Sequence, residues 1–179
     1  MKEEQQLIIV NPYNQQITTA KKQLTHEKGY LHRAFSIFIF DVRQTEIKLL
    51  LQQRNSTKYH CANLWSNSCC SHPFLDEDIK KAAKRRMQEE LGFKTELHQV
   101  HWLHYRAIMQ NNIIENEIDC IFVGFYNDEK IAINSQEVQQ IKWQNFINLT
   151  HDIKYKKQIF TPWFVTTYLI AINWLKNNF

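Results

Sequence analysis

Glycine and proline are scarce in this chain, with three of each among 179 residues. Turns must therefore depend on Asn, Asp and Ser, whose side chains hydrogen-bond to the nearby backbone. Repeats, low-complexity tracts and linker-like stretches are also absent from the sequence. We expect a single domain that extends from residue 1 to residue 179.

Signals for secretion or membrane insertion are missing as well. The polar start, Met1–Gln6, is not followed by the apolar core of a signal peptide. The longest apolar stretch, Trp163–Leu175, is interrupted by Thr and Asn and is too short to cross a bilayer. These absences predict a soluble, cytoplasmic protein with no membrane partner.

Charge and cysteine content argue against a nucleic-acid-binding protein and against a fold held by zinc or disulfides. The net charge is only +4, and no run of Lys or Arg resembles a nucleic-acid-binding tail, so we expect no nucleic-acid partner. The four cysteines, Cys61, Cys69, Cys70 and Cys120, have neither zinc-binding CxxC spacing nor the pattern of a disulfide framework, and we interpret them as thiols. A mild basic excess suits a small anionic substrate.

Apolar side chains are abundant, at 44% of residues, and runs of them predict strands. The predicted strands are Leu7–Val10, Ala34–Phe40, Ile47–Leu51, Leu97–Met109, Glu115–Tyr126 and Val138–Trp143. Thr57–Ser71 has no clear period and predicts a loop with short extended pieces.

The clearest predicted helix is Asp76–Leu91, with acids in its first turn, an apolar stripe every fourth residue from Ile79, and Gly92 as its C-terminal stop. Pro162 is expected to start a last helix that runs to about Asn177. This order of elements predicts an α/β (α+β) fold in which a mixed sheet is sandwiched between helices.

The first candidate for chemistry is the pair Arg86 and Glu90, which share one helix face at the edge of the apolar stripe. The carboxylate could bind a hard cation and the guanidinium could hold phosphate in a bidentate way. The alternative is an ordinary solvated ion pair. Spacing alone leaves both interpretations open.

The second candidate is Glu115-Asn116-Glu117, whose two acids point to the same side of a strand. Two such charges repel unless a cation or a shared proton relieves them. The strand then continues into an apolar segment, which brings the acids near the core. The alternative is a solvent-facing acidic strand end.

Histidines and one thiol form the remaining candidates. Imidazoles at His26, His32 and His72 suit a divalent metal, although for any single His a hydrogen-bonded structural role is the simpler interpretation. Cys70 lies two residues before His72, and a thiol beside positive charge can act as an acid or base. Cys69 and Cys120 fit a buried structural role, and we expect the other histidines to be surface or hydrogen-bonded residues, namely His60, His98, His101, His104 and His151.

Together these segments resemble a known family. Residues Ser71–Phe93 are similar to the Nudix box, G-x5-E-x7-R-E-U-x-E-E-x-G-U, where U is a bulky apolar residue. The positions in register are Glu77, Arg85, Met87, Glu89, Glu90, Gly92 and Phe93. Ser71 replaces the opening Gly, and Arg86 replaces a Glu that helps to bind catalytic metal in Nudix hydrolases. This second departure disfavours diphosphate hydrolysis and leaves diphosphate binding possible.

Further motifs resemble type 1 isopentenyl diphosphate isomerases. They are Leu31–Ser36, Trp65–Pro73, Tyr105–Ala107, Glu115–Glu117 and Pro162-Trp163, so the resemblance covers nearly the whole chain from about Lys22. It implies a Nudix-type fold and an enzyme that interconverts isopentenyl and dimethylallyl diphosphate. Two rival functions remain: a Nudix hydrolase of a nucleoside diphosphate derivative, and a degenerate Nudix domain that only binds a ligand.

The resemblance also implies roles for individual residues. Cys70, Glu117 and Tyr105 are the expected proton-transfer groups. The expected metal-binding set is His26, His32, His72, Glu115 and Glu117, and Glu90 is expected to contact Mg²⁺ carried by the diphosphate. The expected substrate-binding residues are Lys22, Arg54, Lys58, Arg86 and Trp163. The metal in the His/Glu site is left open between Mn²⁺, Zn²⁺ and Mg²⁺. The expected partner is a small isoprenoid diphosphate, bound by a monomer or weak homodimer.

Overall fold

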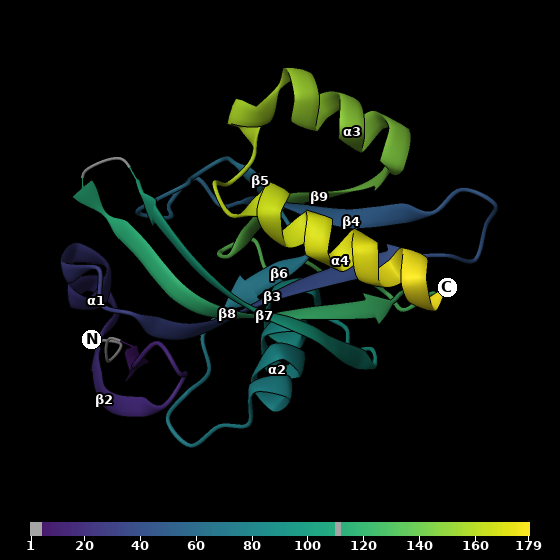
Figure 1. Ribbon diagram of the computed structural model, residues 1–179. Helices are drawn as coiled ribbons and strands as arrows, with labels where there is room; N and C mark the ends of the chain where they lie inside the picture. The colour runs from purple at the N-terminus through teal and green to yellow at the C-terminus, as the bar shows by residue number, and fades with distance from the viewer. Residues whose placement is uncertain (1–4, 110–111) are drawn as a thin grey trace.

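The computed structural model describes residues 5–109 and 112–179 (Figure 1). Its strands are β1 (Gln6–Val10), β2 (Gln16–Lys21), β3 (His32–Asp41), β4 (Lys48–Arg54), β5 (Trp65–Ser66), β6 (Cys69–Ser71), β7 (Leu97–Ile108), β8 (Ile114–Phe125) and β9 (Val138–Asn145). Its helices are α1 (Lys22–Lys28), α2 (Ile79–Leu91), α3 (Phe146–Tyr155), the 3-10 turn η2 (Lys157–Ile159) and α4 (Phe164–Asn178).

Strand β3 is the centre of a mixed sheet. It pairs in parallel with β8 along nearly its whole length, and antiparallel with β1, β4 and β6. Strand β7 extends the sheet beyond β8, and β9 pairs with β4. A mostly apolar strand such as β3, with His32 at one end, is typical of a strand covered on both faces.

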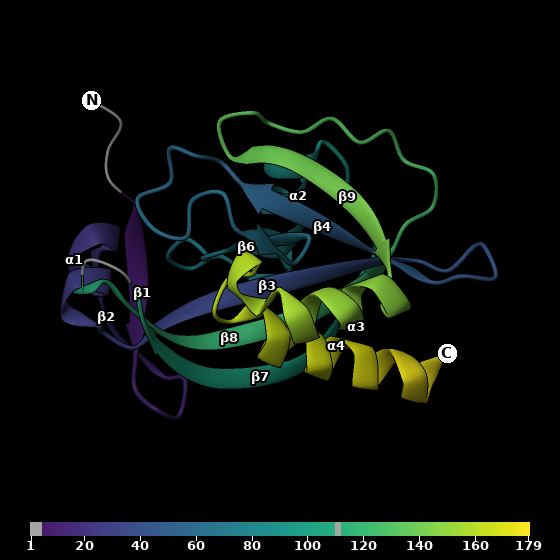
Figure 2. The same cartoon turned by 90° about the horizontal axis from the view of Figure 1, so that it is seen from above.

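Helices cover the two faces of this sheet, α2 on one side and α4 on the other (Figures 1 and 2). Beneath α2, the residues Met87 and Leu91 pack against Phe35 and Phe122. Beneath α4, Phe164 packs with Phe38. The predicted sandwich of a mixed sheet between helices is confirmed. Within the described part of the chain, no helix combines the length and apolar character that a membrane span needs.

Helix α2 begins later than predicted. Asp78 is its N-cap, with a carboxylate that accepts from the backbone N–H of Lys81 at 2.9 Å. Asp76 has φ of 59°, in the left-handed region, and Glu77 instead binds the guanidinium of Arg85 at 2.8 Å. The prediction that these acids form the first helical turn is therefore wrong. Gly92 does end the helix, with φ of 79°.

Three elements were not predicted: β2, α1 and α3. Their apolar signal is weak because they are largely exposed. Strand β2 has no buried residue, and α1 buries only Thr25 and His26. Helix α3 buries Leu149 alone among its ten residues. Tertiary contacts rather than local pattern determine these segments.

Candidate active site and metal cluster

One pocket collects most of the residues that the sequence singled out. Much of its lining comes from the first residues of β3 and β8, the last residues of β4 and β6, and the loop after β4. Its lining includes Lys22, Arg54, Lys58, Cys70, His72, Arg86, Glu90, Tyr105, Glu115, Glu117 and Trp163. His26 and His32 are fully buried beside it. Residues from distant parts of the sequence thus converge on one cavity.

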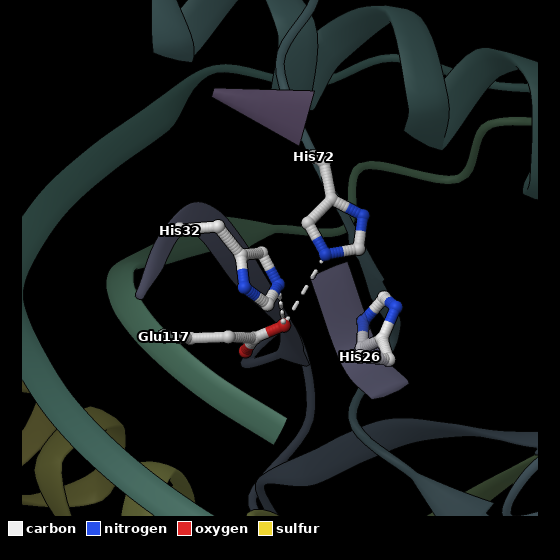
Figure 3. Close-up of side chains that lie close together, drawn as sticks. All are labelled: His26, His32, His72 and Glu117. Carbon is white, nitrogen blue, oxygen red and sulfur yellow. Dashed lines mark hydrogen bonds and ion pairs between the residues drawn. The ribbon is translucent and has the colours of Figure 1, made fainter. Parts of the chain in front are cut away.

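Four side chains in this region form a candidate metal cluster, shown in Figure 3. They are His26, His32, His72 and Glu117, and one ligand atom from each lies within 4.8 Å of the others. Glu117 Oε1 is 3.4 Å from His32 Nε2 and 3.2 Å from His72 Nε2. The parallel register pairs His32 directly with Glu117 and thereby sets the distance between them.

The hydrogen bonding of the imidazoles fits a metal site. The Nδ1 of His26 lies 2.7 Å from the carbonyl of Lys22, and the Nδ1 of His32 lies 2.9 Å from that of Tyr30. A carbonyl only accepts, so we assign the proton to each Nδ1, which leaves each Nε2 with a lone pair. Both Nε2 atoms are buried without a hydrogen-bond partner among the described residues. A divalent cation would satisfy both atoms.

Glu115 stands next to this cluster rather than within it. Its Oε2 is 3.3 Å from His26 Nε2, and its Oε1 is 2.6 Å from His60 Nε2. Burial acts to raise the pKa of Glu115, but its contacts with the imidazoles of His26 and His60 outweigh burial and hold that pKa well below its usual value. The acids of this strand are buried, so the alternative of a solvent-facing strand end is wrong.

His60 is the main residue of the site that the sequence did not single out. It was expected at the surface or in a hydrogen bond, and the second description fits, since its side chain is 7% exposed and pairs with Glu115. The other histidines of that group, His98, His101, His104 and His151, are exposed. Loop residues such as His60 have no periodicity that would have indicated burial.

Cys70 and Glu117 line the same pocket from different strands. Both β6 and β8 pair with β3, so the two side chains approach the cavity from separate directions. Tyr105 lies directly opposite Glu117 in the β7–β8 ladder. Burial raises the pKa of the Cys70 thiol to about 12, although Arg54 acts in the opposite sense. Burial, with the charge of Glu117, also raises the pKa of Tyr105 well above its usual value.

We call the four basic residues of the pocket lining its basic wall. Lys22, Arg54, Lys58 and Arg86 all line the pocket. Burial lowers the pKa of Lys22, and the charges of Lys58 and Arg54 lower it further. Such mutual repulsion among buried cations marks a site suited to an anion.

Arg86 and Glu90 make a buried rather than a solvated pair. Their Nη2 and Oε1 atoms are 2.6 Å apart, and their side chains are 18% and 5% exposed. The interpretation as an ordinary solvated ion pair is therefore wrong. The second oxygen of Glu90 accepts from Gln52 Nε2 at 3.3 Å.

Trp163 closes one side of the pocket and is held in a fixed orientation. Its Nε1–H donates to Ser66 Oγ at 3.1 Å, and the Arg54 guanidinium carbon lies 5.5 Å from the ring centroid. The buried Cys69 and Cys120 contribute to the core beneath α2, as expected for structural thiols.

Comparisons with known proteins agree on the fold and the family. Residues 30–164 match the NUDIX domain family. The isopentenyl-diphosphate Delta-isomerase 2 of Photorhabdus laumondii is 46% identical over 158 residues, which cover 88% of this chain and 87% of that protein. The isopentenyl-diphosphate Delta-isomerase of Serratia proteamaculans is 43% identical, with 91% and 89% covered.

Solved structures with a similar fold are more distant in sequence. A Deinococcus radiodurans protein superposes with a TM-score of 0.66 at 16% identity, covering 84% of this chain and 89% of the other. A MutT protein from Methanosarcina mazei superposes with a TM-score of 0.62 at 14% identity, covering 83% and 96%. At these identities the likeness concerns the fold alone.

Proposed function

The chain belongs to the isopentenyl-diphosphate Delta-isomerases of the NUDIX domain family, and from that premise we propose that its pocket interconverts isopentenyl diphosphate and dimethylallyl diphosphate. The reaction moves a carbon–carbon double bond. A proton is added at one carbon and another is removed two carbons away. The observation that carries the proposal is the single pocket lined by both Cys70 and Glu117.

The chemistry demands two acid–base groups and exclusion of water. An unactivated alkene is a very weak base, so its protonation produces a species that resembles a tertiary carbocation. Water would trap such a cation, which requires a dry cavity. Groups that approach a flat substrate from different directions can add one proton and remove the other without reorienting the substrate.

In the forward direction Glu117, in its carboxylic acid form and beside Tyr105, gives its proton to the alkene, and Cys70, as the thiolate, takes the second proton. In the reverse direction the Cys70 thiol donates and the Glu117 carboxylate accepts. Burial raises the pKa of Cys70, which makes the thiolate a strong base in the forward direction. Tyr105 holds its proton, because its pKa is raised by burial and by Glu117.

The four basic residues, Lys22, Arg54, Lys58 and Arg86, bind the diphosphate. This binding energy is remote from the reacting carbons and serves to position them. Trp163, which lines the pocket, would contact the hydrocarbon and stabilise developing positive charge, a contribution of about 2 kcal/mol in a desolvated site.

The residues that would hold a divalent metal are His26, His32, His72 and Glu117, with Glu115 adjacent. Imidazole and carboxylate donors accept Mn²⁺, Zn²⁺ or Mg²⁺. When bound, the cation would supply positive charge that makes the protonated carboxyl of Glu117 a stronger acid and so promotes its proton release to the alkene. Glu90 also lines the pocket and would contact Mg²⁺ that arrives with the diphosphate.

The hydrolase alternative receives little support from the site. Arg86 stands where a metal-binding Glu is needed, and it pairs with Glu90 at 2.6 Å. Its guanidinium also lies 3.3 Å from Glu137. A cation in this position binds phosphate and repels a catalytic metal.

The test is to incubate the purified protein with isopentenyl diphosphate and either Mg²⁺ or Mn²⁺, and to follow dimethylallyl diphosphate by NMR. We expect interconversion in both directions and incorporation of solvent deuterium. Phosphate release from a nucleoside diphosphate derivative without isomerisation would establish the hydrolase instead. Binding of isopentenyl diphosphate without turnover at every metal loading would indicate a binding domain.

A further inference from the structure

The loop between β4 and β5, residues 55–64, makes one contact with the candidate metal cluster and one with the adjacent Glu115. His60 Nε2 lies 2.6 Å from Glu115 Oε1, and Tyr59 Oη lies 2.9 Å from His26 Nδ1. The same loop carries Lys58, which lines the basic wall of the pocket. One loop therefore touches both the expected anion site and the expected metal site.

The contact from His60 determines how Glu115 is oriented. The carboxylate of Glu115 is 4% exposed and is shared between two imidazoles, His60 on one oxygen and His26 on the other at 3.3 Å. An N–H that donates to one oxygen fixes the rotation of the carboxylate plane and directs the other oxygen toward His26. That second oxygen has no hydrogen-bond partner among the described residues.

The backbone of the loop is held in place by the strand that precedes it. Arg54 donates from Nη2 to the carbonyl of His60 at 3.2 Å, and its backbone N–H donates to Leu64 at 2.9 Å. Asn63 donates back to the carbonyl of Arg54 at 3.1 Å. The position of His60 is thus tied to Arg54, a residue of the basic wall.

We propose that His60 is a positioning residue for the metal cluster: by donating to Glu115 it holds that carboxylate beside His26, and it links the diphosphate-binding loop to the cation. This inference rests on the proposed function, because it takes the His/Glu cluster to be a metal site. His60 lies outside the four residues whose ligand atoms converge, so it acts through Glu115 rather than as a ligand.

The alternative to positioning is simple packing, and the chain allows the two to be separated. The His60 ring packs edge-on against Tyr59, with centroids 4.4 Å apart. His60→Phe keeps a ring in this position and removes the donor. His60→Gln loses the ring but can place an amide N–H near the position of Nε2.

A matched control is present in the neighbouring strand β7. His104 Nε2 is 2.9 Å from Oδ1 of Asn116, the residue between the two acids, but His104 is exposed and lies away from the pocket. His104→Phe therefore makes the same chemical change beside the same segment. It should leave metal binding unchanged.

The experiment titrates each metal-free protein with Mn²⁺ alone and follows free Mn²⁺ by electron paramagnetic resonance. We expect His60→Phe to weaken Mn²⁺ binding by about 10- to 100-fold, the usual cost of losing a partner of a metal-binding group. His60→Gln should stay within about threefold of the unaltered protein, by the same reasoning. In isomerase assays, excess Mn²⁺ should restore kcat of the Phe variant.

Two outcomes overturn the inference while leaving the proposed function intact. These are Mn²⁺ binding by His60→Phe equal to that of the unaltered protein, and binding by His60→Gln as weak as that of His60→Phe. If the unaltered protein binds no Mn²⁺ at all, the metal site and this inference both fail. Circular dichroism checks folding, and His60→Leu, which also lacks a donor, replaces the Phe variant if that protein does not fold.

Discussion

The two halves of the β3–β8 pair share one continuous parallel ladder, but one half carries polar side chains and the other carries apolar side chains. At one end His32 faces Glu117, and buried imidazole nitrogens lack hydrogen-bond partners among the described residues. At the other end Phe38 pairs with Val123, and both side chains are completely buried in an apolar cluster. The apolar half stabilises the fold, whereas the polar half has buried charges that cost stability unless a ligand satisfies them.

The largest effect should come from the proton-transfer residues of the polar half. Cys70→Ala and Glu117→Gln should each lower kcat by about 10²- to 10⁴-fold, since each removes one acid–base group. The measurement is the initial rate of isopentenyl diphosphate conversion. Near-normal turnover by either variant would show that the role assigned to that residue is wrong.

Cys69→Ala is the control for the Cys70 variant. Cys69 is the neighbouring thiol but is fully buried in the core beneath α2. Its loss should cost stability and leave turnover of the folded protein within a few-fold. A loss of activity equal to that of Cys70→Ala would mean that the assignment to Cys70 does not distinguish the two thiols.

The next largest effect should come from the apolar half. Phe122 is completely buried and pairs with Ile37 of β3. Phe122→Ala should lower the free energy of unfolding by about 3–5 kcal/mol, through lost burial and the cavity left behind. Urea denaturation measures this change. Turnover per folded molecule should stay within about threefold, and a much larger loss would contradict the division between the halves.

Metal removal should affect the polar half alone. With Mn²⁺ at about 100 times its dissociation constant, the metal adds about 2.7 kcal/mol of stability. For a chain of this size that corresponds to a Tm increase of about 5–10 °C. Melting curves with and without chelator measure the difference. The metal should raise the Tm of Phe122→Ala by the same amount. A smaller rise in Tm would mean that the two halves are coupled.

The smallest effect should arise at the boundary between the halves, where Asp119 follows the two acids on the same face of β8. It is buried and accepts from Ser36 Oγ at 2.8 Å. Burial raises the pKa of Asp119 well above its usual value, with the charge of Glu117 acting in the same direction. A raised carboxyl pKa stabilises the fold below the unfolded pKa of about 4, and this contribution is lost as the pH rises.

The side chain introduced by Asp119→Asn cannot ionise, so the variant should not lose stability in this way as the pH rises. In chelated protein, the variant should gain stability relative to the unaltered chain between about pH 4 and about pH 7. Urea denaturation at both pH values tests this. Parallel pH dependence in the two proteins would show that Asp119 does not titrate as its burial implies.

Much of the fold could be predicted because burial leaves a pattern in the sequence. The apolar runs of β3 and β8 and the stripe from Ala83 through Met87 to Leu91 lie in the core, as expected. Segments that bury little, such as β2 and α3, carry no such pattern. The start of α2 was misplaced because Glu77 resembles a first-turn acid but instead binds Arg85.

The site was predictable only where a motif or a resemblance indicated it. The spacing of residues in the sequence could not predict that His26 lies near Glu117, because that proximity depends on how α1 lies against β8. His60 gave no signal, since it belongs to an irregular loop and its partner Glu115 is distant in sequence. Asp119 was hidden inside an apparently apolar strand. These are long-range contacts, which local sequence does not encode.

The four residues of the candidate metal cluster are spread from position 26 to position 117, and His32 and Glu117 meet only when β3 and β8 align in parallel. Parallel pairing of segments so far apart in the chain is slow, because a long loop must close before any contact forms. Metal uptake during refolding therefore reports on a late step, the arrival of β8 beside β3. A nascent chain would acquire the proposed cation-binding capacity only after Glu117 had been synthesised and β8 had reached β3.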